Sequence, residues 1–83
     1  MFSEKSIVRG QGKRMEIVVT NNSWVLTLFD GEEKVDTFKA SRIPLYDSSC
    51  IEEWLSRNGA SCLCTPAGIE IQRLNKRKRW GLL

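Results

Sequence analysis

The sequence predicts a small α+β domain, in which an antiparallel sheet of βββαββ order carries one short helix on one face. Three observations lead to this prediction. Apolar and polar residues alternate along residues 15–40, turn-forming residues interrupt that alternation, and one stretch after residue 49 has helical periodicity. The chain has 83 residues, of which 41% are hydrophobic and 28% charged, and this balance is typical of a single globular domain.

Three strands are expected before the helix. Residues 15–20 alternate between two faces, and residues 24–29 are rich in aromatic and branched side chains, which favours a central strand. The Asn-Asn-Ser cluster at 21–23 separates them as a turn. An Asp-Gly pair at 30–31 predicts a hairpin that leads into a third strand at 34–40.

The helix is expected over residues 50–57. Ser49 and Glu52 have the spacing of a capping box, and an Asn-Gly pair at 58–59 supplies a left-handed stop. The apolar face of the helix, which is expected to pack on the sheet, consists of Ile51, Trp54 and Leu55.

A second hairpin is expected after the helix. Residues 61–65 and 69–74 flank a Pro-Ala-Gly sequence at 66–68, which favours a turn. Residues 41–47 contain Pro44 and are expected to connect the sheet to the helix.

The predicted domain spans residues 15–74 and has basic flanks. Residues 1–14 hold four cations and one acid and are expected to form a basic arm or an edge strand. Residues 75–83 form a predicted basic tail that ends in Trp-Gly-Leu-Leu. From Arg73 to the C-terminus there are five cations and no acid, whereas residues 15–72 hold nine acids and four cations. The body is therefore acidic and both ends are basic.

The basic ends make nucleic-acid binding the first functional hypothesis. Adjacent cations displace counterions from a phosphate backbone, and an indole can stack on a base. The residues expected to bind are Arg73, Lys76, Arg77, Lys78, Arg79, Trp80, Lys13 and Arg14. The same run also fits an acidic protein groove, or a solvated tail whose Trp80 folds back on the sheet.

Two glycines beside cations near the N-terminus allow a phosphate-binding turn. Gly10 and Gly12 lie next to Arg9 and Lys13, but their spacing does not match a Walker A loop. They also lack the strand, turn and helix context of a dinucleotide site. A flexible arm is the favoured interpretation of this segment.

The second hypothesis is a protein inhibitor, of the kind encoded by phages and mobile elements. Carboxylates can stand in for phosphates, so an acidic hairpin could cover the nucleic-acid groove of a host protein, such as a defence or regulatory complex. The residues expected to bind in this case are Asp30, Glu32, Glu33, Asp36, Leu45 and Tyr46. Simple polar turn residues and an apolar loop that caps the core are the structural alternatives.

No catalytic or metal site is expected, and no cofactor. The chain has no histidine, so the commonest general base is missing. The three cysteines, Cys50, Cys62 and Cys64, lack the spacing of a structural zinc site. An odd number of cysteines favours reduced thiols, expected here to line a small core.

Taken together, these observations predict a non-enzymatic binding protein that acts on nucleic acid or on a nucleoprotein complex. The longest apolar run is far too short to cross a bilayer, and the N-terminus lacks the pattern of a signal peptide. A cytoplasmic protein without membrane contact is therefore expected, and its oligomeric state is left open.

Overall fold

The computed structural model describes residues 3–41 and 49–81. Its four strands form one antiparallel sheet, in which each strand pairs with the next along the chain. The strands are β1 (Ser3–Gly10), β2 (Lys13–Thr20), β3 (Ser23–Asp30) and β4 (Glu33–Ser41). Helix α1 (Ser49–Arg57), a short 3₁₀ turn η1 (Ser61–Leu63) and helix α2 (Cys64–Gly81) follow.

The α+β class and the antiparallel sheet are confirmed, but the βββαββ order is only partly correct. Four strands precede the helices, because residues 3–10 form the edge strand β1. The turn after β1 consists of Gln11 and Gly12, both with positive φ (48° and 81°), which suits a two-residue hairpin. The expected turns after β2 and β3 are present.

The second predicted hairpin is instead the helix α2. Pro66 lies in the first turn of α2, where its missing N–H has no helical partner to lose. Leu63, Ala67, Ile71 and Leu74 are buried at helical spacing, whereas Ile69 is 64% exposed. A strand would place positions 69 and 71 on the same face, but the helix places them on opposite sides. The predicted tail is also part of α2 up to Gly81.

Helix α1 is confirmed, with its three predicted apolar residues buried. It ends at a left-handed Gly59 (φ 68°). The amide of Ala60 donates to the carbonyl of Leu55 (2.7 Å), and the amide of Gly59 donates to the carbonyl of Ser56 (3.1 Å). These two bonds form a Schellman motif, which satisfies carbonyls that the helix end would leave unpaired.

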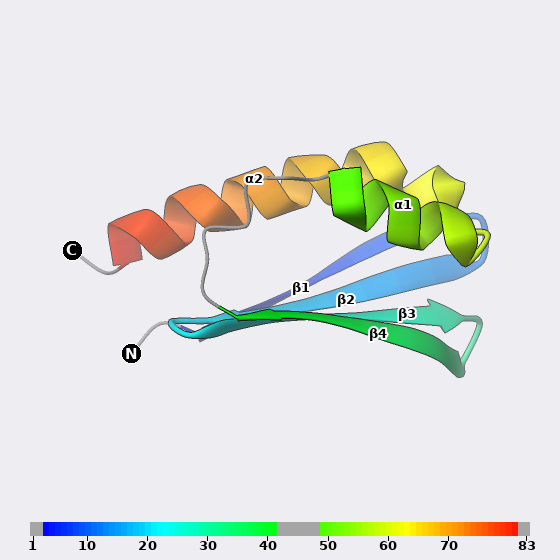
Figure 1. The fold of residues 1–83 in the computed structure, drawn as a ribbon, viewed down its shortest axis with the longest axis horizontal. Coiled ribbons are helices and arrows are strands. Elements are labelled where there is room, and N and C mark those ends of the chain that lie inside the picture. Colours follow the sequence, from blue (N-terminus) through cyan, green and yellow to red (C-terminus); the bar gives the residue numbers. More distant parts are fainter. Residues whose placement is uncertain (1–2, 42–48, 82–83) are drawn as a thin grey trace.

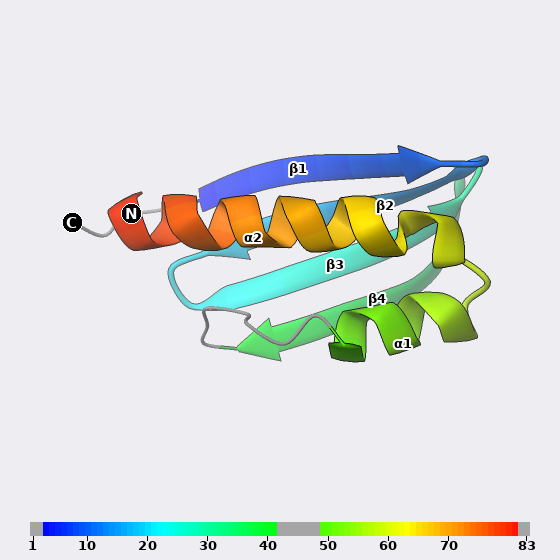
Figure 2. The same ribbon diagram turned by 90° about the horizontal axis from the view of Figure 1, so that it is seen from above.

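Both helices cover the same face of the sheet. Helix α2 lies along β1 and β2, and α1 lies over β4 (Figures 1 and 2). Between the two layers is a single core, whose largest fully buried side chain is that of Trp24. Within residues 3–41 and 49–81, no helix lies over the opposite face of the sheet (Figure 1).

The cysteines differ in part from the expectation. None of the three forms a disulfide, and Cys62 and Cys64 are partly buried against the core. Cys50 is exposed on α1, so the prediction that it lines the core is wrong. The direction in which successive side chains point around α1 explains the difference. The neighbouring Ile51 points into the core, so Cys50 points away from it.

Two isoleucines of α2 provide a test of this fold. Replacing Ile71 by Ala should lower the free energy of unfolding by about 2–5 kcal/mol, since it leaves a cavity in the core. The same change at exposed Ile69 should alter it by less than about 0.5 kcal/mol. Denaturant unfolding measures both values. Similar large losses at the two positions would contradict α2 and restore the hairpin.

Candidate functional site

The strand register sorts the sheet residues into a helix-covered face and an open face. Buried Val8, Met15 and Leu28 are cross-strand neighbours under the helices, so the residues that alternate with them point to the other side. The open face consists of two charged rows that flank a central row.

Three rows of cross-strand neighbours define the open face. The first row runs Arg9, Arg14, Phe29, Lys34 across the four strands. The central row runs Ile7, Glu16, Thr27, Thr37, and the third runs Lys5, Val18, Val25, Lys39. Five cations therefore share this face with one carboxylate, while the sheet's other acidic residues lie on the helix side or in the turn after β3.

Arg14 is held in place at the end of the open face. Its guanidinium lies 4.1 Å from the centre of the Phe29 ring, in a cation–π contact. One terminal nitrogen donates to the carbonyl of Gly31 (2.8 Å), and Nε contacts the carboxylate of Glu16 (3.4 Å). The guanidinium is thus oriented before any ligand arrives.

Glu16 is the only carboxylate among the three rows, and two cations contact it. Lys5 Nζ lies 3.1 Å from one of its oxygens, and Arg14 contacts the other. The hydrogen bond from Lys5 is the main reason that the pKa of Glu16 falls below its usual value. Arg9, Lys34 and Lys39 are exposed, and within the described residues they make no ion pair. These three cations are available to an external anion.

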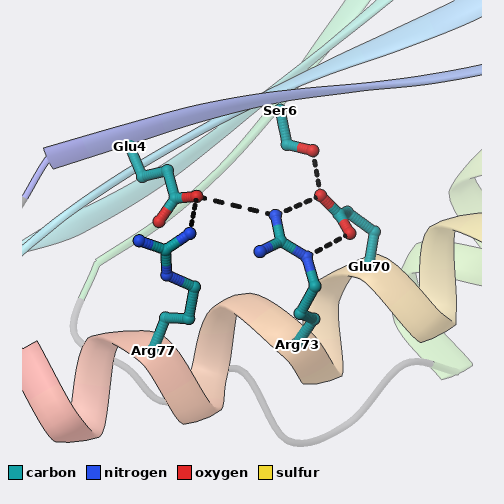
Figure 3. Close-up of polar contacts among 5 residues, drawn as sticks. All are labelled: Glu4, Ser6, Glu70, Arg73 and Arg77. Carbon is teal, nitrogen blue, oxygen red and sulfur yellow. Dashed lines mark hydrogen bonds and ion pairs between the residues drawn. The ribbon is translucent and has the colours of Figure 1, made fainter.

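Two of the predicted basic residues of α2, Arg73 and Arg77, are engaged within the protein. Arg77 lies 2.9 Å from the carboxylate of Glu4, and Arg73 contacts both Glu4 (3.5 Å) and Glu70 (2.7 Å). Ser6 donates a further hydrogen bond to Glu70. These contacts join α2 to the edge strand β1 (Figure 3). They raise the pKa of Arg73, chiefly through Glu70, and lower that of Glu70, chiefly through Arg73.

The structure separates Lys13 and Arg14 from the basic end of α2, although the first functional hypothesis includes both in one set of binding residues. Lys13 begins β2, at the end of the sheet where α2 starts, whereas the last turns of α2 lie beside the start of β1 (Figure 2). The molecule is 37 Å long along this direction. Lys76 is exposed on α2, and the backbone of Lys78, Arg79 and Trp80 belongs to the same helix. Lys13 pairs with Asp30 on the helix side of the sheet (3.1 Å).

The predicted acidic surface is also partly engaged. Besides the pair between Asp30 and Lys13, Asp36 accepts hydrogen bonds from the indole N–H of Trp54 (2.9 Å) and the amide of Thr37 (2.8 Å). The bond from Trp54 is the main cause of the lowered pKa of Asp36. Glu32 and Glu33 remain exposed. Leu45 and Tyr46 lie outside the described residues.

Sequence reasoning missed four residues of the open face, Lys5, Phe29, Lys34 and Lys39, and considered Arg9 only as part of a phosphate-binding turn. The period of two in the predicted strands carried the relevant signal, because positions that alternate with buried ones share a face. The cluster is not apparent when charges are grouped by their position along the chain. It becomes apparent when the residues of each strand are divided into the two alternating sets that point to opposite faces.

Other kinds of site find no support in the described parts of the chain. Residues 3–41 and 49–81 contain no group of three or more acidic, cysteine or histidine residues placed to hold a metal ion. Among these residues no helix is long and apolar enough to span a membrane. No protein-family model matches the sequence, and neither curated proteins nor solved structures gave a match.

The contact between Asp36 and Trp54 makes a prediction about acid stability. Because folding lowers the pKa of Asp36 from 3.8, its ionised form stabilises the fold above that pH. This contribution is lost as the pH falls through the folded-state pKa. An Asp36→Asn variant should therefore be less stable than wild type at pH 7, and the difference should shrink below about pH 4.

Urea unfolding between pH 2.5 and 7 measures this difference, with Glu32→Gln at the neighbouring turn as a control for the loss of one charge. A difference for Asp36→Asn that stays constant across this range would contradict a stabilising role of the carboxylate charge.

Proposed function

We propose that the protein binds single-stranded nucleic acid on the open face of its sheet. The observation that carries this proposal is the register, which gathers five cations and one carboxylate on the face that the helices leave uncovered. When the cations of a protein bind the phosphate backbone of a nucleic acid, counterions are released. This release supplies most of the non-specific affinity for nucleic acid.

The pattern within the face favours a single strand over a duplex. Apolar side chains lie between the charged positions: Ile7 is 42% exposed, and Val18, Val25 and Phe29 are partly exposed. The phosphates of a duplex would meet only the cations and leave these apolar groups unmatched. The unpaired bases of a single strand offer π-faces that pack on aromatic and aliphatic groups. The guanidinium of Arg14 over Phe29 is a further flat surface for stacking.

The charges on α2 are less suited to be the main binding surface. Two of them, Arg73 and Arg77, are neutralised by Glu4 and Glu70. Cations in the last turns of a helix also interact favourably with its dipole, which gives the run a structural role. Binding to a host protein through the acidic hairpin is weakened as an alternative, because Asp30 and Asp36 already have partners.

A pair of matched double variants tests which surface binds. Arg9→Gln with Lys39→Gln removes one arginine and one lysine from the open face, and Arg57→Gln with Lys76→Gln removes the same pair from the helices. All four residues are exposed. The open-face variant should bind at least about tenfold more weakly at low salt, and its salt slope should fall by about 1.4, or 0.7 for each lost phosphate contact. The helix variant should bind as the wild type does.

Fluorescence anisotropy with labelled single-stranded DNA, single-stranded RNA and duplex DNA, each at two salt concentrations, gives these values. Equal losses in both variants would mean that net charge, and not the open face, determines binding. No binding of any probe at low salt would overturn the proposal and leave a protein partner as the next hypothesis.

A variant of Phe29 tests the contribution of base stacking to binding separately from that of charge. Phe29→Leu should weaken binding of a single-stranded probe by about fivefold or more and leave the salt slope unchanged, because no charge is removed. Val35→Ala, at the bulge between β3 and β4 where the residue is 43% exposed, is the control and should have little effect. An unchanged affinity for Phe29→Leu would exclude base stacking at this position.

A further inference from the structure

A hollow of about 450 Å³ lies at the end of the sheet where β1 turns into β2. It is lined by three cations, Arg9, Lys13 and Arg14, and by the turn that follows β1. Gly31, from the turn after β3, closes one side, and its amide donates to the carbonyl of Gly12 (3.0 Å). This backbone hydrogen bond joins the two turns that line the hollow.

The lining is strongly one-sided in charge. Each of its titratable residues is a cation, and none of its residues is a carboxylate. Contacts to Asp30 and to the carbonyl of Gly31 position Lys13 and Arg14. Arg9 has no ion pair or side-chain hydrogen bond among the described residues, so its guanidinium is free to bind an anion.

The backbone of the hollow is open to close approach. Gly12 and Gly31 both have positive φ, and a Cβ placed on either would meet no atom within 4 Å. Positive φ explains the choice of glycine at these turns. The empty space beside them means that a ligand can reach the bare main chain, as phosphate groups do at other glycine-rich turns.

We propose that this hollow binds the terminal phosphate of a nucleic-acid strand. The inference rests on the proposed function, because Arg9 and Arg14 also form the last row of the open face, so a strand lying on that face reaches the hollow at its end. A terminal phosphomonoester carries a charge of about −1.5 to −2 at pH 7, more than an internal diester. Three cations around one hollow suit that higher charge.

The volume of the hollow is consistent with this ligand. At about 450 Å³ it falls within the range of pockets that hold small ligands, roughly 300–1,000 Å³. It therefore has room for the terminal sugar as well as the phosphate. The neighbouring Asp30 engages only one of the three N–H donors of Lys13, so Lys13 and Arg9, which has no ion pair among the described residues, can contact the phosphate together.

The test compares oligonucleotides of one sequence that end in a 5′-phosphate, a 3′-phosphate or hydroxyl groups only. One of the phosphorylated ends should bind about tenfold or more tightly than the hydroxyl form, as expected for charge-assisted hydrogen bonds to a dianion. The preference should decline below about pH 6, where the phosphomonoester takes up a proton.

Two variants separate the hollow from the open face. Lys13→Gln changes a lining residue that points to the helix side, and it should abolish the preference while preserving the affinity for the hydroxyl form. Gln11→Glu, in the exposed turn, adds a carboxylate to the same end of the sheet. It should also abolish the preference for a phosphorylated end while preserving the affinity for the hydroxyl form. Lys39→Gln, on the open face outside the hollow, should weaken all three probes equally and keep the preference.

Each outcome bears on one claim. Binding without any preference for a phosphorylated end would overturn the phosphate site and leave the proposed function standing. A preference that survives both Lys13→Gln and Gln11→Glu would place the phosphate elsewhere and also overturn it. Lys13-dependent binding of a nucleoside monophosphate, without binding of any oligonucleotide, would support a phosphate site and overturn the proposed function.

Discussion

One-sided burial is the constraint on which the rest of the structure depends. The two helices cover one face of the sheet, so every strand must present its apolar set to that face. Because side chains alternate along a strand, a shift of one residue would exchange the two faces completely. The buried positions of β2 and β3 therefore determine the register, and the register determines what remains on the open face. The gathering of cations there follows from the same packing that forms the core.

The ion pairs between α2 and β1 extend that constraint to the edge of the sheet. Strand β1 has few buried side chains, with Val8 the main one, so apolar packing alone holds it weakly. Glu4 and Ser6 point to the helix side and meet Arg73, Arg77 and Glu70 (Figure 3). Surface ion pairs contribute little one at a time, but a network that shares residues orders several side chains together. Two cations of a run that resembles a binding site in the sequence, Arg73 and Arg77, thus attach α2 to the sheet.

The sequence predicts the elements with clear periodicity and misses those in which two signals conflict. The alternation in residues 15–40 and the apolar face of α1 both gave correct elements. In α2, Pro66 and Gly68 look like a turn, and the pair Ile69 and Ile71 looks like strand alternation. The spacing of Leu63, Ala67, Ile71 and Leu74 decides the matter only when all four are known to be buried together. Tertiary packing here overrides a local turn preference.

The candidate site could be predicted in part, and for a physical reason. The sequence identifies Arg14 and Lys13, but within a segment that is either a basic arm or an edge strand, because nothing local shows that residues 3–10 pair with β2. Once that pairing exists, Arg9 faces Arg14 across the strands, and two like charges side by side are costly unless an anion lies between them. The core therefore places this pair on the open face, and the fold offers Arg9 no counterion of its own among the described residues. An external phosphate would relieve that repulsion, and this is the physical basis for proposing one anionic ligand for both the open face and the hollow.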